Sequence, residues 1–320
     1  MPTQCNRRHF VKTVAVGLAA NAFLDHGPRS AAAEARRQMT LSLAPGSIGV
    51  RADQRQTIAL AHKHGFEAVE AFPNYLASLD NTQLQELLAD LKTKGLVFGA
   101  AGLPVEFRQD DTRFADSLRA LPKLADALQR AGVDRVTTWI SPAHGSLTYL
   151  KNFAQHARRL REAARVLKDR GQRLGLEYVG TPMSRQGRRF HFIHTLVEMQ
   201  ELIADIGTGN VGLVLDSWHW WTAGETTADL LKLKAADVVS VDLNDAPAGL
   251  AVEQQQDGKR ELPCATGVIP VADFLNTLNQ IGFDGPVRAE PFNKALNDLP
   301  DDDACAAVIR ALRKAMALLK

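Results

Sequence analysis

Short apolar runs and longer amphipathic stretches alternate along the chain from about residue 39 onward. The runs are rich in β-branched residues and predict strands, whereas the stretches between them repeat leucine and alanine three and four positions apart and predict helices. The eight predicted strands are Thr40–Leu43, Ala68–Ala71, Val97–Ala101, Arg135–Ile140, Leu174–Tyr178, Gly212–Asp216, Val238–Leu243 and Val287–Glu290. The clearest predicted helices are Thr112–Arg130 and Leu147–Arg170. Glycines that close a helix before the next strand are expected at Gly95, Gly132, Gly171 and Gly282.

Eight alternations of strand and helix predict a parallel sheet that closes on itself. The 320 residues, of which 45% are hydrophobic, can bury one large core. No GxGxxG motif follows the first predicted strand and nothing marks an edge strand, so a closed barrel is favoured over an open, doubly wound sheet. We therefore predict an α/β chain with a single-domain (β/α)8 TIM barrel over residues 36–320.

The segment Asp245–Thr266 is too long for an ordinary connection between a strand and a helix. It contains Pro247, Gly249, Gly258 and Pro263, which interrupt regular structure. Loops of this length are commonly functional, and this one follows the seventh predicted strand at the end where barrel enzymes carry their sites. We predict that it is a lid or a substrate-binding loop.

The first 35 residues have the order of a twin-arginine export signal. Arg7 and Arg8 precede Phe10, a mildly apolar run covers Val14–Leu24, and three alanines follow at positions 31–33. The apolar run is too short for a membrane span. A basic amphipathic helix that caps the barrel is the alternative. We predict that residues 1–35 are a twin-arginine signal peptide and that the folded protein is exported to the periplasm.

The charge balance bears on the class of partner. The formal net charge of +2 comes from 38 Lys and Arg against 36 Asp and Glu, and the first 35 residues hold four cationic and two acidic side chains, so the remainder is neutral. A neutral body lacks the basic surface that binds a polyanion, which argues against nucleic acid or an anionic membrane as a partner. A small-molecule substrate is expected, and the oligomeric state stays open, a homo-oligomer included.

Three cysteines, Cys5, Cys264 and Cys305, show neither the spacing of a metal site nor a disulfide framework. Cys5 would leave with the export signal. A disulfide between the other two needs an oxidising compartment and a suitable geometry, and two independent thiols are the favoured interpretation.

Acidic residues stand at the ends of four consecutive predicted strands. They are Glu177, Asp216, Asp242 and Glu290. A charged residue in an otherwise apolar strand is costly unless it is paired or binds a metal. Any one of them could belong to a structural ion pair, but four on one rim, with no matching set of cations on the strands, favour a single divalent metal.

Five short motifs accompany the late predicted strands. They are Leu176-Glu177, Leu215-Asp216-Ser217-Trp218-His219, Val241-Asp242-Leu243-Asn244-Asp245, Gly258-Lys259-Arg260-Glu261-Leu262-Pro263 and Gly285-Pro286-Val287-Arg288-Ala289-Glu290-Pro291. Through them the chain resembles, over about residues 39–318, the sugar isomerase/epimerase family with the xylose isomerase-like barrel, which includes ketose 3-epimerases and hydroxypyruvate isomerase. The order of Asp-x-x-His and the closing glutamate is the most specific part of the resemblance, and each motif alone is weak.

The resemblance implies a metal centre that is also the acid and base of the reaction. In that family a glutamate, an aspartate, a histidine and a second glutamate hold the metal, which implies Glu177, Asp216, Asp242 and Glu290 here, with the two glutamates exchanging a proton. The chain departs at the seventh strand, where family members carry histidine and this sequence has Asp242. Asn244 lies on the same face of that strand and is the alternative fourth ligand. With Asp242 the shell is all oxygen, which favours Mn²⁺ or Mg²⁺ over Zn²⁺.

Four further residues are candidates for contact with substrate. The resemblance implies that His219 bonds a substrate hydroxyl and that Arg260 holds the far end of the substrate; a histidine that orients a carboxylate and a lone surface arginine are the alternatives. Trp218 offers an aromatic face to a sugar, with core packing as the alternative. Glu70, at the end of the second strand, could bond substrate hydroxyls or belong to an internal ion pair.

Such a site is suited to proton transfer at a carbon next to a carbonyl. That proton is weakly acidic, and the enediolate left by its removal needs a cation beside its oxygens. We therefore expect a divalent-metal-dependent sugar isomerase or epimerase. Two alternatives stay open, namely a metal-dependent lyase or hydratase acting on 3-keto-glycosides, and a barrel that binds sugar without catalysis.

Overall fold

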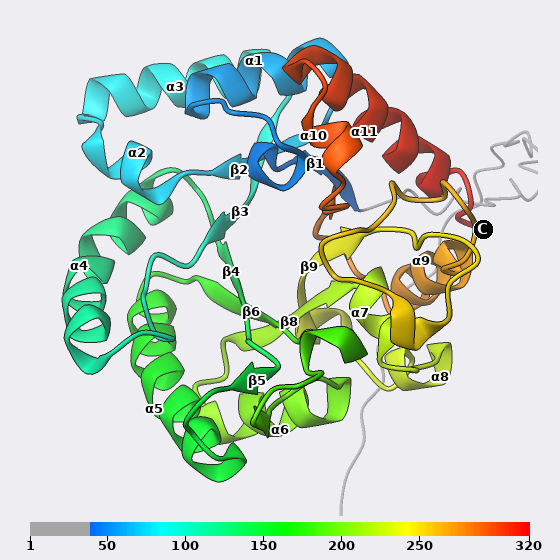
Figure 1. The fold of residues 1–320 in the computed structure, drawn as a ribbon. Coiled ribbons are helices and arrows are strands. Elements are labelled where there is room, and N and C mark those ends of the chain that lie inside the picture. The colour runs from blue at the N-terminus through cyan, green and yellow to red at the C-terminus, as the bar shows by residue number, and fades with distance from the viewer. Residues whose placement is uncertain (1–38) are drawn as a thin grey trace, which may run out of the picture. The chain divides into compact units, whose positions relative to one another are not determined.

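The fold is a closed barrel of eight parallel strands, which confirms the predicted architecture (Figure 1). The computed structural model describes residues 39–320, and the predicted signal peptide lies outside this range. Around the barrel the strands follow one another in the order β1-β10-β9-β8-β6-β4-β3-β2. Their bounds are β1 (Thr40–Leu43), β2 (Ala68–Ala71), β3 (Val97–Gly102), β4 (Arg135–Trp139), β6 (Arg173–Glu177), β8 (Val211–Asp216), β9 (Val238–Leu243) and β10 (Pro286–Ala289).

The strand bounds agree with the predicted ones to within one residue at each end. Glu290, predicted as the last residue of the final strand, lies directly after β10. The barrel closes because β1 pairs with β10 in parallel register, with Thr40 opposite Pro286 and Leu41 opposite Val287. Most positions of β1, β6, β8 and β9 are buried, as expected for a parallel sheet that helices cover on its outer face, whereas β3 and β4 keep partly exposed positions.

Helices surround the barrel, and most of them begin or end at a recognisable signal. Asp53, Asp80 and Thr195 each form a capping box at the start of α1, α3 and α6. Gly95, Gly132, Gly171 and Gly282 all take a positive φ shortly after a helix, as predicted. The α-helices are α1 (Gln54–His64), α2 (Pro73–Ser78), α3 (Asn81–Thr93), α4 (Asp111–Arg130), α5 (Tyr149–Lys168), α6 (Leu196–Ile206), α7 (Ser217–Thr222), α8 (Thr227–Leu230), α9 (Val271–Gln280), α10 (Lys294–Asn297) and α11 (Asp301–Met316). Short 3₁₀ helices are η1 (Pro45–Ile48), η2 (Pro182–Ser184), η3 (Ala235–Asp237) and η4 (Val252–Gln254).

The first and last helices of the barrel lie side by side and complete the ring (Figure 1). Arg313 of α11 donates a hydrogen bond of 2.9 Å to the carbonyl of Gly65, which follows α1.

None of the helices in residues 39–320 is long and apolar enough to cross a membrane. Cys264 and Cys305 are free thiols, in line with the favoured interpretation of two independent cysteines.

The long segment after β9 is tied to the barrel by the buried carboxylate of Asp245. This carboxylate accepts four backbone hydrogen bonds of 2.7 to 3.0 Å, from the N–H groups of Ala246, Thr266, Gly267 and Ile269. Asp245 also forms a backbone bridge with Glu261, so both ends and the middle of the segment are fixed. The predicted lid or binding loop is therefore an ordered wall at the carboxyl end of the barrel.

A second, two-stranded sheet also stands at this end and was not predicted. It pairs β5 (Ala143–His144), which follows β4, with β7 (Phe190–His191), which follows β6, in antiparallel register. The two strands are too short to leave a periodic pattern in the sequence.

Candidate active site

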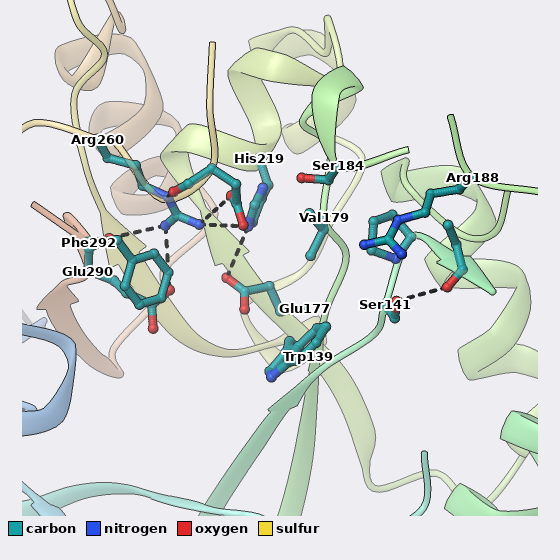
Figure 2. Close-up of a pocket in the computed structure, with 13 residues that line it drawn as sticks. Trp139, Ser141, Glu177, Val179, Ser184, Arg188, His219, Arg260, Glu290 and Phe292 are labelled. Carbon is teal, nitrogen blue, oxygen red and sulfur yellow. Dashed lines mark hydrogen bonds and ion pairs between the residues drawn. The ribbon is translucent and has the colours of Figure 1, made fainter. Parts of the chain in front are cut away.

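A pocket of about 530 Å³ opens at the carboxyl ends of the strands (Figure 2). Its acidic lining includes Glu177, Asp257 and Glu290, and His219 and Arg260 lie between them. Figure 2 shows the guanidinium of Arg260 directed toward the carboxylates from the side of the long loop, with the ring of Phe292 against it. The pocket thus lies at the carboxyl-terminal rim of the barrel, where TIM-barrel enzymes have their active sites.

The parallel register of the strands brings the four predicted acids together. Glu177 ends β6 and Asp216 ends β8, while Asp216 and Asp242 are directly paired residues of β8 and β9. Glu290 follows β10. One ligand atom each from Glu177, Asp242 and Glu290 lies within 4.8 Å of the others, and the same holds for Glu177, Asp216 and His219.

Glu177 is the least satisfied of these acids. Its side chain is buried, and Oε1 has no hydrogen-bond partner among the described residues. Nε2 of His219 lies 3.9 Å from this oxygen. Burial, followed by the negative charges of Glu290 and Asp242, raises the pKa of Glu177 well above its usual value.

Asp216 has both oxygens engaged. Oδ1 accepts hydrogen bonds of 2.8 Å from the backbone N–H of Trp218, which it caps at the start of α7, and from the side-chain amide of Asn244. Oδ2 accepts from Arg260 at 2.8 Å. Burial raises the pKa of Asp216 to about 6, although the charge of Arg260 opposes that rise.

Glu290 faces two guanidinium groups. Oε1 accepts a hydrogen bond of 3.0 Å from Arg288, and Oε2 lies 3.5 Å from Nη1 of Arg260. Its backbone N–H donates to Oδ1 of Asn244 over 3.2 Å. Burial is the main reason that the pKa of Glu290 rises to about 7, with Arg288 acting against it. Asn244 therefore orients Asp216 and Glu290 through its amide. Because both its amide nitrogen and its amide oxygen are hydrogen-bonded in this way, Asn244 is disfavoured as a fourth metal ligand.

Asp242 is paired with an arginine from the neighbouring strand. Oδ1 accepts from Nε of Arg288 at 2.6 Å and Oδ2 accepts from Nη2 at 2.8 Å, while the Asp242 side chain is completely buried. The sequence argument that no cation on the strands matches the acids is wrong on this point. Arg288 stands in β10 directly opposite Asp242 in the parallel register, and the pairing of two distant segments hid this relationship.

His219 is buried between the backbone N–H of Gly180 and the guanidinium of Arg260. The backbone N–H of Gly180 donates to Nδ1 at 3.2 Å, and Nη2 of Arg260 lies 3.2 Å from Nε2. Burial, and then the charge of Arg260, lower the pKa of His219 to about 3, so the ring is neutral over the working range of most enzymes. As predicted for a site histidine, it lines the pocket, where it can bond a hydroxyl or hold a carboxylate.

Arg260 links the long loop to the strand ends. Besides Asp216, its guanidinium bonds Asp257 at 2.8 Å and the carbonyl of Glu290 at 3.1 Å. Asp216 and Asp257 hold the pKa of Arg260 above its usual value despite burial. Burial alone would raise the pKa of Asp257, but Arg260 and His219 bring it below the usual value. Sequence reasoning missed Asp257, for which the only signal was its place three residues before Arg260 in the same loop.

Two predicted substrate contacts lie elsewhere. Trp218 is fully buried behind the pocket wall, where its indole N–H donates to Thr181 over 2.7 Å and its ring lies 5.5 Å from the Arg260 guanidinium carbon. Core packing, the alternative considered for this residue, describes its position. Glu70 lines a separate small cavity inside the barrel, together with Arg288, and burial raises its pKa. Neither residue lines the pocket, because Trp218 packs behind its wall and Glu70 faces the barrel interior.

The site fits a divalent cation in charge and in donor chemistry. Five carboxylates, those of Glu177, Asp216, Asp242, Asp257 and Glu290, surround the guanidinium groups of Arg260 and Arg288, which leaves an excess of three negative charges when all five acids are ionised. The unpaired Oε1 of Glu177 is the kind of buried oxygen that a cation satisfies. Two sets of side chains lie close enough to hold it, Glu177 with Asp242 and Glu290, and Glu177 with Asp216 and His219.

Comparison with known proteins finds relatives that share the xylose isomerase-like barrel. A family model described as xylose isomerase-like TIM barrel matches residues 58–315. The structure of a xylose isomerase domain protein from Alicyclobacillus acidocaldarius superposes with a TM-score of 0.77 and 33% sequence identity, over 88% of this chain and 99% of that one.

Two curated relatives are enzymes. A 3-dehydroshikimate dehydratase from Pseudomonas aeruginosa is 27% identical over 267 residues, which is 82% of this chain but 39% of the dehydratase, so the chain spans about two fifths of that relative. An inosose isomerase from Bacillus velezensis is 24% identical over 249 residues, covering 74% of this chain and 83% of the isomerase.

Proposed function

The chain belongs to the xylose isomerase-like TIM barrel family, and we propose that within it the protein is a divalent-metal-dependent isomerase or epimerase of a sugar or another polyhydroxylated ketone. The observation that carries the proposal is the pair Glu177 and Glu290. These carboxylates line one pocket, and burial raises the pKa of both; that of Glu290 rises to about 7, where a carboxyl group both gives and takes a proton near neutral pH.

Each residue of the pocket has a separate role in the proposed proton transfer. One glutamate takes the proton from the carbon next to the carbonyl, and the other returns a proton to the enediolate on the same or the neighbouring atom. His219, neutral and buried, bonds a hydroxyl or the carbonyl oxygen of the substrate. Arg260 holds Asp216 and Asp257 in place and presents positive charge to the developing oxyanion.

A metal ion adds one element that the side chains lack. A bound divalent cation supplies positive charge beside the carbonyl and hydroxyl oxygens of the substrate. Most atoms of the two candidate ligand sets are oxygens, which favours Mn²⁺ or Mg²⁺. The excess negative charge around Glu177 supports this assignment.

Solvent exchange tests the proposal directly. The metal-loaded protein is incubated in D₂O with inososes and ketoses, and deuterium in the intact sugar is measured by mass spectrometry. We expect incorporation with wild type and a loss of at least about hundredfold with Glu177→Gln or Glu290→Gln. Glu253→Gln, which changes an exposed glutamate on the long loop, is the matched control and keeps the wild-type rate. No exchange with any ketone, in a protein that binds metal, would contradict catalysis and favour a barrel that only binds sugar.

A lyase is the second candidate, and the dehydratase relative is the observation that favours it. Removal of the same proton starts an elimination when a hydroxyl or a glycosidic oxygen stands on the next carbon. A substrate of this kind, such as a 3-keto-glycoside, would lose water or its aglycone. Release of the aglycone, measured beside deuterium exchange, separates the two reactions because an isomerase leaves the substrate skeleton whole.

Export through the twin-arginine route remains our proposal for residues 1–35, supported by the order of Arg7, Arg8 and the apolar run. Fractionation of cells that express wild type or the Arg7→Lys/Arg8→Lys variant tests it. We expect the wild type in the periplasm and the variant retained in the cytoplasm.

A further inference from the structure

Arg188 places an unpaired positive charge on the side of the pocket opposite the acids. Its side chain lines the pocket, and Figure 2 shows it across from Glu290 and Arg260, with Ser184 between them. Among residues 39–320, no group accepts a hydrogen bond from its guanidinium or forms an ion pair with it. A guanidinium stays charged at every pH at which an enzyme works, and it has five N–H donors. The donors of Arg188 are therefore free for a ligand in the pocket.

The other arginines around Arg188 are already engaged. Arg185 donates to a backbone carbonyl of its own loop at 2.8 Å, and the guanidinium carbon of Arg189 lies 5.0 Å from the centre of the Phe190 ring. Arg260, across the pocket, is bonded to two carboxylates. Of the three arginines in residues 185–189, only Arg188 lines the pocket, which sets it apart from a basic turn that merely faces solvent.

The loop that carries Arg188 is held in place on both sides. β7 begins two residues later and pairs with β5, and the backbone N–H of Phe192 donates to the carbonyl of Pro142 at 2.7 Å. On the other side, the backbone N–H of Arg188 donates to the carbonyl of Arg185 at 3.0 Å. A ligand that binds Arg188 therefore orders one side chain and not a whole loop, which keeps the entropic cost of binding low.

A single guanidinium next to hydroxyl groups suits a carboxylate better than a phosphate. The planar guanidinium can donate two parallel N–H bonds to the two oxygens of a carboxylate, and the hydroxyl-bearing Ser141 and Ser184 line the same pocket. Phosphate sites commonly add a helix N-terminus. The helix that follows this loop, α6, has its first N–H groups in use, since Leu196 donates to the carboxylate of Glu225.

The charges of the pocket select one orientation of such a ligand. A carboxylate beside Glu177 and Glu290 would be repelled, whereas the same group beside Arg188 is attracted, and the ketone then faces the acids. We propose that Arg188 determines the specificity of this pocket by binding a carboxylate, so that the substrate is a polyhydroxylated ketone that also carries a carboxylate group. This inference rests on the proposed function, because the acids on the other side act on the carbon next to the ketone.

Pairs of ligands that differ by one carboxylate test the inference. D-Fructuronate has a carboxylate where D-fructose has a terminal hydroxymethyl group, and D-glucuronate differs from D-glucose in the same way. Binding of all four to the Mn²⁺-loaded protein is measured by calorimetry. We expect wild type to bind the carboxylate member of at least one pair at least about tenfold more tightly, and Arg188→Gln to reduce this preference to within about twofold. Arg188→Lys should keep part of the preference because it retains the charge without the planar pair of donors.

Arg189→Gln is the matched control, because it removes a neighbouring exposed arginine that does not line the pocket. It should keep the wild-type preference, which shows that the effect is local and does not come from the net charge of the protein. Arg188 is exposed, so Arg188→Gln is expected to unfold at the wild-type temperature.

Deuterium exchange on the same four ligands separates the inference from the proposed function. A preference that depends on Arg188, without exchange into any ketone, supports the carboxylate site and counts against catalysis. Exchange into D-fructose by a wild type that shows no carboxylate preference in either pair overturns the inference, while the proposed function stands. A preference that persists in Arg188→Gln also overturns it, because the carboxylate then binds elsewhere, such as at the metal.

Discussion

The backbone N–H of Gly180 donates a hydrogen bond of 3.2 Å to Nδ1 of His219, and the two segments are in such close contact that only glycine fits. A Cβ atom at position 180 would lie 2.3 Å from the carbonyl oxygen of His219 and 3.1 Å from Cβ of Ala223. The loop after β6 therefore fixes the orientation of the pocket histidine through its backbone. This contact joins two strand ends that are far apart in the sequence, and it makes the site depend on a residue without a side chain.

Gly180→Ala should displace His219 and loosen the start of α7. We expect a loss of about 1–3 kcal/mol in the free energy of unfolding, typical of an overpacked interior position, together with a fall of at least about tenfold in deuterium exchange. Urea unfolding and the exchange assay measure the two effects. Gly102→Ala is the control, since no atom lies within 4 Å of a Cβ there, and equal losses in both variants would refute the role of the close contact.

Asp245→Asn should release the long loop. The replacement puts an amide N–H₂ where a carboxylate oxygen accepts two backbone N–H groups, so buried donors lose their partner. We expect a loss of about 2–3 kcal/mol in stability and faster proteolysis within residues 245–266. Exchange activity should fall as well because Arg260 is carried by this loop. Asp303→Asn, on the exposed face of α11, is expected to change none of these, and a loop that resists protease in Asp245→Asn would argue against the anchor.

His156 should make stability depend on pH. Its ring is buried between Phe107 and Phe192, and Nδ1 bonds the carbonyl of Asn152 while Nε2 has no partner within residues 39–320. Burial lowers the pKa of His156 to about 4. The unfolded chain, with a pKa of about 6.5, binds more protons between these two values, so stability is full above about pH 6.5 and falls as the pH drops toward 4.

The contribution of His156 can be isolated by difference. Between pH 7 and pH 5 we expect wild type to lose about 2 kcal/mol more unfolding free energy than His156→Phe, which keeps the aromatic packing and cannot be protonated. Urea unfolding at both pH values measures this. His191→Gln, an exposed histidine, should behave as wild type, and identical pH dependence in all three proteins would show that His156 is not the group concerned.

Removal of divalent cations should abolish exchange reversibly. The acids of the pocket outnumber its guanidinium groups, and with the unpaired oxygen of Glu177 they need a cation for the pocket to stabilise an oxyanion. Treatment with a chelator followed by dialysis is expected to lower deuterium exchange at least about hundredfold, and Mn²⁺ or Mg²⁺ to restore it. Full activity in protein that metal analysis finds free of divalent cations would disprove the dependence.

Several parts of this protein follow from the sequence alone. The strands are short, mainly apolar runs of four to six residues, and most helices carry boundary signals, so both are determined largely by neighbouring residues. The acids Glu177, Asp216 and Glu290 were found because a charge at the end of an apolar strand is conspicuous locally. That they meet at one rim follows from the parallel arrangement of the strands.

Other features could not be read from the sequence because they depend on which strands become neighbours. The pairing of Asp242 with Arg288 of the next strand has no local signal, and Asp257 has no local feature that points to the pocket. Trp218 stands between Asp216 and His219 in the sequence yet packs behind the pocket wall, and Glu70, near the end of β2, faces the small cavity inside the barrel. Hydrophobic periodicity determines the elements through short-range interactions, whereas the pairing of charges inside a closed barrel is decided by register, burial and distance between segments that are remote along the chain.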